Sequence, residues 1–295
     1  MNFRTDLALE MREAHSGSFD GLHSREERHG QIKITRVEVT SQAGAKAIGK
    51  PVGIYVTLEF PSLDHLPDLG EEAVELGVQQ LRGLIPADGA VLCVGLGNDA
   101  ITPDSLGPKT LEKILATRHI SGEQAHSVGV GELRPVACLV PGVLGRTGIE
   151  SAELLQAAVE KLRPGCVIMI DALASRRLSR LGRTVQISTG GITPGSGVGN
   201  ARAEISRGTL GVPVISIGMP CVVDAATLAV DLLSQGTEIS RDDIRATMEP
   251  DGEQMMVTPR EVDLLIDRAS KLIAMMVNLT LQPNLAPEDF TALMG

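Results

Sequence analysis

The sequence predicts an α/β protein with a three-layer αβα arrangement around a mostly parallel central sheet. Short continuous apolar runs recur between residues 90 and 220, as in parallel strands buried on both faces. Segments with helical periodicity separate these runs. The chain has 295 residues, 43% of them hydrophobic, which is enough for a substantial core. We therefore expect residues 1–295 to form a single α/β domain.

Residues 1–30 form an N-terminal segment with mixed charge, in which we expect a short helix around Asp6 to Arg12 followed by a loop. From Gln31 to Phe60 apolar residues alternate with polar ones, which predicts an antiparallel strand pair over 31–60. An amphipathic helix follows, closed by Pro86; the residues on its apolar face are Val74, Val78, Leu81 and Ile85.

Residues 90–280 are expected to form the α/β core. Its predicted strands are AVLCVGLG at 90, VACLVPG at 136, CVIMIDA at 166, TVQIS at 184 and VPVISIGMP at 212. A helix to Leu162 opens with Thr147 and Glu150 in the spacing of a capping box, and the last long helix opens in the same way at Thr258 and Glu261. The polar stretch 235–254 is predicted to be a connection.

The composition excludes several classes of function. A net charge of −10 argues against a direct nucleic-acid binder, which needs a basic face, although a basic partner protein remains open. No apolar stretch reaches the roughly 18 residues of a membrane span, and the N-terminus has acidic residues where a secretory signal is apolar. We expect a cytoplasmic protein without membrane contact. The four cysteines have no C-x-x-C spacing and are predicted to be buried, reduced thiols.

Candidate site residues follow the predicted strands, because ligands of parallel sheets bind beyond the carboxyl ends of the strands. Asp104 and Asn98 follow the first core strand, and Asp171 follows the apolar part of the third. Asp104 alone also fits a helix cap, and Asp171 fits a structural or a catalytic carboxylate equally well. Further candidates are Arg176, in a local basic cluster, and four residues of a glycine-rich turn whose N–H groups we expect to face a substrate: Gly191, Gly195, Ser196 and Gly197.

Nucleophilic and cofactor chemistry have weaker support. No G-x-S-x-G motif occurs, and none of the six histidines falls in these loops. GLGNDA is only half of a dinucleotide fingerprint. Two neighbouring aspartates can share one proton, so that one protonates the substrate while the other activates water for amide hydrolysis. We expect neither a metal nor another cofactor.

These residues lie in motifs that resemble the germination protease family, also called spore protease. The matching stretches are RTDLA from Arg4, VGLGN, TPDSLGP, VPGVLGRTGIE, IDALASR, PGSGVGN, TLGVPVISIGMPCVVDA and MVTPREVD. They span nearly the whole chain in order. Thr189 and Thr193 receive no role from the match.

The resemblance implies an endopeptidase that degrades small acid-soluble DNA-binding spore proteins during germination in the forespore or spore core. It also implies a fold similar to hydrogenase-maturation endopeptidases, a homotetramer, a zymogen, and Asp104 and Asp171 as the catalytic pair. Only three residues precede Arg4, so we expect activity without processing.

Two alternatives remain. In a metal-assisted endopeptidase of the hydrogenase-maturation kind, Asp104 and Asp171 would hold a divalent ion. In a non-catalytic nucleotide-binding module, GLGN and the glycine-rich turn would hold the ligand.

Overall fold

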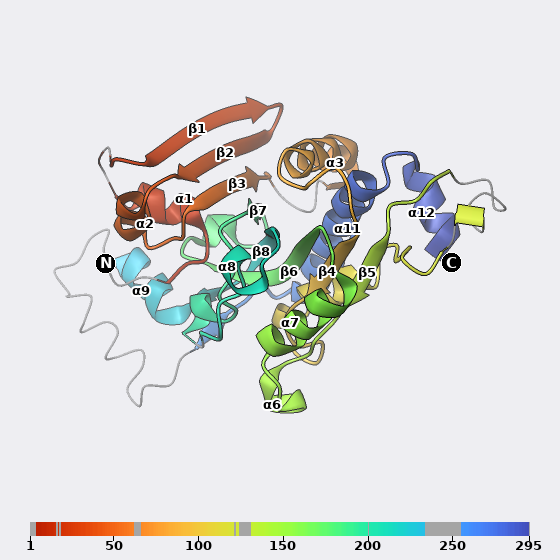
Figure 1. The fold of residues 1–295 in the computed structure, drawn as a ribbon. Helices are drawn as coiled ribbons and strands as arrows, with labels where there is room; N and C mark the ends of the chain where they lie inside the picture. The colour runs from red at the N-terminus through yellow and green to blue at the C-terminus, as the bar shows by residue number, and fades with distance from the viewer. Residues whose placement is uncertain are drawn as a thin grey trace.

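The computed structural model describes residues 4–15, 17, 19–61, 66–120, 122–123, 131–199, 201–233 and 255–294. They form an α/β fold around a nine-stranded sheet, which confirms the predicted class (Figure 1). The predicted connection at 235–254 lies outside the described residues. Within the described part of the chain, no helix is long and apolar enough to cross a membrane.

The sheet is mixed, so the predicted mostly parallel sheet is wrong in this respect; the added N-terminal strands and the strands β7 and β9 pair antiparallel. The strand order is β1-β2-β3-β7-β8-β6-β4-β5, with β9 paired to β8. Neighbours from β8 to β5 are parallel, and all other neighbours are antiparallel. The N-terminal strands extend the parallel part because β3 pairs with β7. The strands are β1 (Leu22–His29), β2 (Ile32–Val39), β3 (Gly53–Glu59), β4 (Val91–Gly95), β5 (Val136–Leu139), β6 (Cys166–Ser175), β7 (Thr184–Ser188), β8 (Val214–Asp224) and β9 (Met256–Val257).

The predicted loop before residue 30 is wrong, because β1 occupies most of it. The short helix α1 (Ala8–Glu13) is present, but β1 pairs with β2 and turns the expected strand pair into three antiparallel strands. β1 is an edge strand whose side chains are mostly exposed and charged, so it lacks the apolar alternation that marks a half-buried strand. The helix α2 (Gln42–Ile48) then connects β2 to β3.

Helices cover both faces of the sheet. α3 (Leu66–Arg82), α4 (Leu106–Leu111) and α11 (Val262–Leu281) supply one core with Ile168 and Ile170 of β6. α7 (Ser151–Leu162) and α8 (Arg207–Leu210) supply the other core with Val167 and Met169 of the same strand. Figure 1 shows α7 in front of the sheet and α11 behind it. Alternate residues of β6 thus enter opposite layers, as expected for a strand buried on both faces.

Both predicted capping boxes are wrong. The hydroxyl of Thr147 bonds to the carbonyl of Val143 at the end of the short helix α6 (Leu144–Thr147), and α7 begins only after Glu150. The hydroxyl of Thr258 donates to the carbonyl of Cys221 at 3.0 Å, and α11 begins after Glu261. In both places another hydrogen bond takes the hydroxyl that sequence spacing had assigned to a helix N-terminus. The remaining helices described are α9 (Ala225–Leu233) and α12 (Pro287–Met294).

Candidate active site

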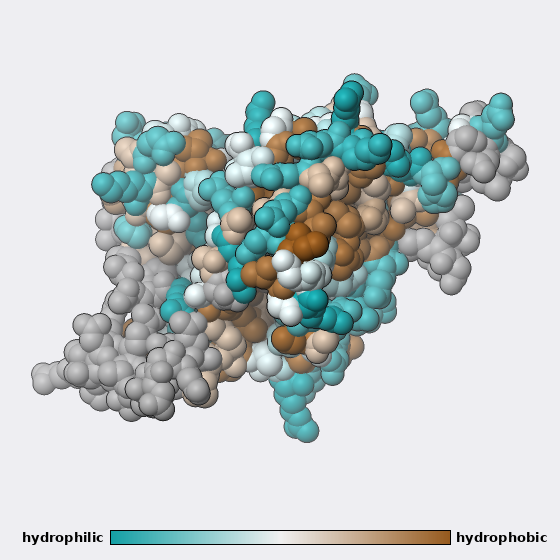
Figure 2. Space-filling model, turned by 60° about the horizontal axis from the view of Figure 1, so that its bottom comes forward, coloured by the Kyte–Doolittle hydropathy of each residue, from teal (hydrophilic) through white to brown (hydrophobic). Residues whose placement is uncertain are grey.

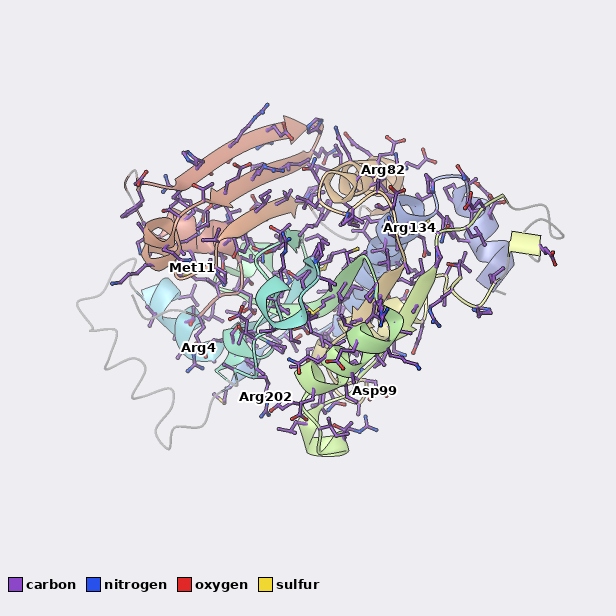
Figure 3. The ribbon with its side chains drawn as sticks, in the orientation of Figure 1. Arg4, Met11, Arg82, Asp99, Arg134 and Arg202 are labelled. Atoms are coloured by element: carbon purple, nitrogen blue, oxygen red, sulfur yellow. The ribbon has the colours of Figure 1, made fainter. Side chains whose placement is uncertain are left out.

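A cavity of about 860 Å³ lies at the carboxyl ends of β4 and β6. It brings together most of the predicted site residues, namely Asn98, Asp104, Asp171, Gly191, Gly195, Ser196 and Gly197. Arg4 and Arg202 also line it; Figure 3 shows them on one side of this region and Asp99, from the loop after β4, on the other. Segments far apart in the sequence therefore meet at one edge of the sheet, as the strand-end argument predicted.

Asp104 is fixed by the loop that follows β4. It ends the 3-10 turn η2 (Thr102–Asp104), and the N–H of Asn98 donates to its main-chain oxygen at 3.1 Å and its Oδ2 at 2.9 Å. Ser105, not Asp104, is the N-cap of α4, and it makes no side-chain capping bond. Asp104 is therefore held as a carboxylate facing the loop and the cavity, not as a helix cap.

Glycines bring this loop against β6. A Cβ on Gly107 would lie 2.2 Å from the main-chain oxygen of Leu96 and 2.6 Å from that of Ile170. Gly97 has φ of +110°, and a Cβ there would lie 2.0 Å from the main-chain oxygen of Asp104. The absence of side chains at these positions lets α4 and the Asp104 loop pack directly on the strand ends.

Asp171 lies in the interior of its strand, whereas the sequence suggested a position at the strand's end. β6 continues to Ser175, whereas its neighbour β4 ends at Gly95, opposite Ile170. The Asp171 side chain therefore sits one residue beyond the end of β4 and is only 7% exposed. The prediction missed this because the apolar run ends at the point where β6 loses its neighbour β4, whereas the strand β6 itself continues to Ser175.

The two carboxyl groups have raised pKa values. Burial raises the pKa of Asp171 well above its usual value, and the negative charges of Asp104 and Asp6 raise it further. Burial raises the pKa of Asp104 to about 6, although the N–H of Asn98 acts in the opposite direction. Of the two carboxyl groups, Asp171 is thus the one that burial and neighbouring charge favour in the protonated form, and Asp104 is the one that ionises more readily. This is the division that acid-base hydrolysis by a carboxyl pair needs.

Sequence reasoning assigned no role to Asp6 and Lys50, which also line the cavity. The Asp6 carboxylate accepts hydrogen bonds from the N–H of Ala174 at 2.8 Å and from the hydroxyl of Ser196 at 3.1 Å. The Lys50 ammonium donates to the carbonyl of Thr5 at 3.1 Å; burial lowers its pKa, and the charges of Asp6 and Glu10 oppose that effect. In the sequence, Asp6 was marked only by the family-like stretch RTDLA in which it lies. Lys50 lies in no motif that could have marked it as a site residue.

The glycine-rich turn is only partly open to a substrate. It contains the 3-10 turn η4 (Ser196–Val198), in which the N–H groups of Ser196 and Val198 bond to carbonyls of the turn. Within the described ranges, no hydrogen bond from the N–H groups of Gly191, Gly195 and Gly197 is present, although Gly197 is buried against the carboxylate of Asp6. Asn200 lies outside the described residues.

Arg176 does not line the cavity. Its N–H donates to the carboxylate of Glu10 at 2.6 Å, and the residue is half-buried. Its neighbour Arg180 is 5% exposed and bonds to three carboxylates, those of Glu10, Glu13 and Glu59. The basic cluster thus contains a buried network that joins α1, β3 and the chain after β6.

The cysteine prediction holds for three of four residues. All four thiols are free, but Cys138 is exposed, because it lies on the edge strand β5. No group of three or more histidine, cysteine, aspartate or glutamate side chains is arranged to hold a metal ion among the residues that the structure describes.

The raised pKa of Asp104 gives a stability prediction. Between pH 3.8, the ordinary pKa, and about 6, the folded state binds more protons than the unfolded state, so stability falls as pH rises through this window. Asp104→Asn removes the ionisation and is expected to stabilise the protein at pH 7 by about 2 to 3 kcal/mol, and by little at pH 3.5. Urea unfolding at both pH values measures the difference.

Asp20→Asn is the matched control, since Asp20 is exposed and its carboxylate makes no hydrogen bond among the described residues. Its effect should stay within about 0.5 kcal/mol at both pH values. Equal stabilisation by Asp104→Asn at both pH values would contradict the raised pKa.

Comparison with known proteins identifies the family of the chain. A family model described as germination protease matches residues 4–235. Similar proteins include the germination proteases of Clostridium tetani, 42% identical with 99% of both chains covered, and of Priestia megaterium, 36% identical with 98% of this chain and 96% of the relative covered.

Among solved structures, a [NiFe] hydrogenase maturation protease HycI from Thermococcus kodakarensis aligns with a TM-score of 0.37 at 14% identity, covering 67% of this chain and 98% of that one. The match to the family model and the full-length similarity to its members decide the assignment: the chain belongs to the germination protease family.

Proposed function

We propose that this peptidase starts the degradation of small acid-soluble DNA-binding spore proteins during germination, with Asp104 and Asp171 as its catalytic pair. The observation that carries the proposal is the cavity in which both carboxyl groups have raised pKa values for a physical reason, burial. Perturbed acids that share a cleft are typical of catalytic sites.

The different surroundings of the two acids suggest their roles. Asp104, mostly ionised at pH 7, takes a proton from the attacking water. Asp171, the more deeply buried acid, donates a proton to the substrate carbonyl oxygen. When the C–N bond breaks, Asp104 gives its proton to the leaving amine nitrogen, and Asp171 takes back a proton from the hydroxyl group as the carbonyl re-forms. The unused N–H groups of Gly191 and Gly197 line the same cavity and favour the negative charge that develops on that oxygen.

The surroundings of the cavity favour a polypeptide substrate. Figure 2 shows a hydrophobic area near the middle of one face, bordered by hydrophilic side chains. The loops near the cavity expose Ile101 (51%), Val140 (46%) and Ile149 (40%), and Ile101 lines it. Exposed apolar side chains beside a cleft commonly mark a binding surface.

We expect the purified protein to cleave a small acid-soluble spore protein at a small number of bonds. Incubation followed by mass spectrometry of the fragments identifies them, and the same reaction with a chelator separates the acid pair from a metal-assisted mechanism. An intact substrate would contradict the proposed activity. Activity lost with chelator and restored by a divalent ion would contradict the proposed mechanism.

The pH dependence of kcat/KM tests the roles of the two acids. Because Asp104 has to be ionised, kcat/KM should rise about tenfold per pH unit below about pH 6 and level off above it. Loss of the Asp171 proton should lower the rate again at a higher pH. A maximum below pH 5 would contradict the assignment of Asp104 as the base.

The family resemblance also supports a homotetramer, synthesis as a zymogen and location in the spore core as parts of the proposal. Light scattering of the purified protein measures the assembly, and intact mass before and after activation measures processing.

A further inference from the structure

β6 has a free edge inside the cavity. β4 ends opposite Ile170, but β6 runs on to Ser175 and is paired over this stretch only with β8. A strand that loses one neighbour presents unpaired N–H and C=O groups along that side. The stretch contains Asp171, and Ala172 and Ala174 line the cavity with it.

The hydrogen bonds show which residues face this edge. Ile170 accepts a bond from the N–H of Leu96 at 2.8 Å, and Ala174 accepts one from the N–H of Asp6 at 2.9 Å. Val167, by contrast, donates to Pro213 beside β8. Since successive residues of a strand alternate sides, Ala172 faces the cavity edge, between the two points where other segments already contact it.

The main chain of Ala172 is available to a ligand. Its C=O accepts no hydrogen bond from the described residues, and its side chain is a methyl group on a half-buried residue. Its N–H bonds to the Asp171 carboxyl group and thereby opposes the rise in the pKa of Asp171. A substrate carbonyl oxygen in the place of that carboxyl group would accept the same N–H.

We propose that Ala172 is the main-chain docking point for the substrate, where one residue of an extended peptide exchanges N–H···O=C bonds with it as in a β-ladder. The inference rests on the proposed peptidase function and specifies how that site holds its substrate. Neighbouring strands lie about 4.8 Å apart, so a peptide paired with Ala172 passes directly beside Asp171. Asp6 already occupies the same edge at Ala174: its N–H donates to the Ala174 carbonyl, and its carboxylate accepts the Ala174 N–H. The edge therefore binds the main chain of another segment.

An ester scan of the substrate tests the docking. In a peptide of about 12 residues around a bond that the enzyme cleaves, each amide other than the scissile one is replaced in turn by an ester, which removes one N–H donor. We expect one position near the scissile bond to lose about 3- to 10-fold in kcat/KM, the effect of one hydrogen bond. The positions next to it should change less than twofold, because their N–H groups point away from β6.

A protein variant tests the same contact from the other side. Ala172→Pro removes the N–H toward the cavity, and with it the bond to the Asp171 carboxyl group, but it removes no bond to β8. Proline is tolerated on strand edges. We expect KM for the unmodified peptide to rise several-fold with the circular dichroism spectrum unchanged, and Ala172→Gly, which keeps the N–H, to change it less than twofold. If Ala172→Pro does not fold, the ester scan alone decides.

The two proposals fail in different ways. If the enzyme cleaves neither the unmodified peptide nor the spore protein from which its sequence is taken, the peptidase function and the docking are both overturned. A cleaved peptide whose ester series shows no single sensitive position, or equal losses at adjacent positions, would overturn only the docking at Ala172.

Discussion

Asp104→Asn and Asp171→Asn are each expected to lower peptide cleavage by about 100-fold or more while the protein stays folded. Asparagine keeps the shape and much of the hydrogen bonding of aspartate, but it can neither share a proton nor activate water. Because the pKa of Asp171 is also raised in the folded state, Asp171→Asn should increase the free energy of unfolding at pH 7, for the reason given for Asp104→Asn. Single-turnover cleavage of a spore protein substrate, with urea unfolding in parallel, measures both quantities.

The double variant should be little worse than either single variant, because groups that act as a unit show non-additive losses. Asp99→Asn is the matched control on the same loop; Asp99 is exposed and pairs with Arg146, so its loss should change turnover less than twofold. If either single variant keeps more than about a tenth of wild-type turnover, a loss under about 1.4 kcal/mol, that aspartate is not one of the pair.

Arg180→Met is expected to destabilise the protein more than any exposed substitution. Arg180 donates to Glu59 at 2.9 Å and to both oxygens of Glu13 at 2.6 and 2.8 Å, and it lies 3.4 Å from Glu10. Burial opposes ionisation of Glu13, yet the hydrogen bond and charge of Arg180 outweigh it and lower its pKa. Removing the cation leaves buried carboxylates without their partner, which costs about 3 to 5 kcal/mol.

Lys271→Met is the comparison for this variant. Lys271 pairs with Asp267 at 2.8 Å across one helical turn, but both side chains are exposed, so the loss should be about 0.3 to 0.5 kcal/mol. Urea unfolding at pH 7 measures both variants. A cost under about 1 kcal/mol for Arg180→Met would show that the carboxylates find other partners or become protonated.

The sequence predicted the part of the fold whose signals are local. Residues of β4, β6 and β8 form continuous apolar runs because both faces of these strands are buried, and that pattern needs no tertiary information. β1 was not predictable in this way, because its side chains are mostly exposed and show no apolar alternation. Its strand conformation depends on pairing with β2. The two predicted caps failed because other acceptors took the hydroxyls: Thr258 bonds to Cys221, which is distant in the sequence, and Thr147, at the end of the preceding helix α6, bonds to Val143.

The site was predictable to the extent that strand ends mark it. Asp104 and Asp171 follow apolar runs and were found from that position. Asp6 and Lys50 enter the cavity from the N-terminal region, which carries no periodic signal that would place it beside β6. Arg176 was a candidate because of its local basic cluster, but it does not line the cavity, and its main-chain N–H bonds to Glu10, 166 residues away in the sequence.

The pairing of β3 with β7 sets an order on folding during synthesis. β1, β2 and β3 are consecutive and can associate as soon as they leave the ribosome, but the second edge of β3 has no partner until Thr184–Ser188 emerge. At roughly 5 to 20 residues per second, the chain takes on the order of ten seconds to supply that strand. During this interval the nascent chain exposes an open strand edge that can pair with other chains. Slowing translation between β3 and β7 should therefore increase aggregation of the nascent protein, whereas slowing it after β8 should not.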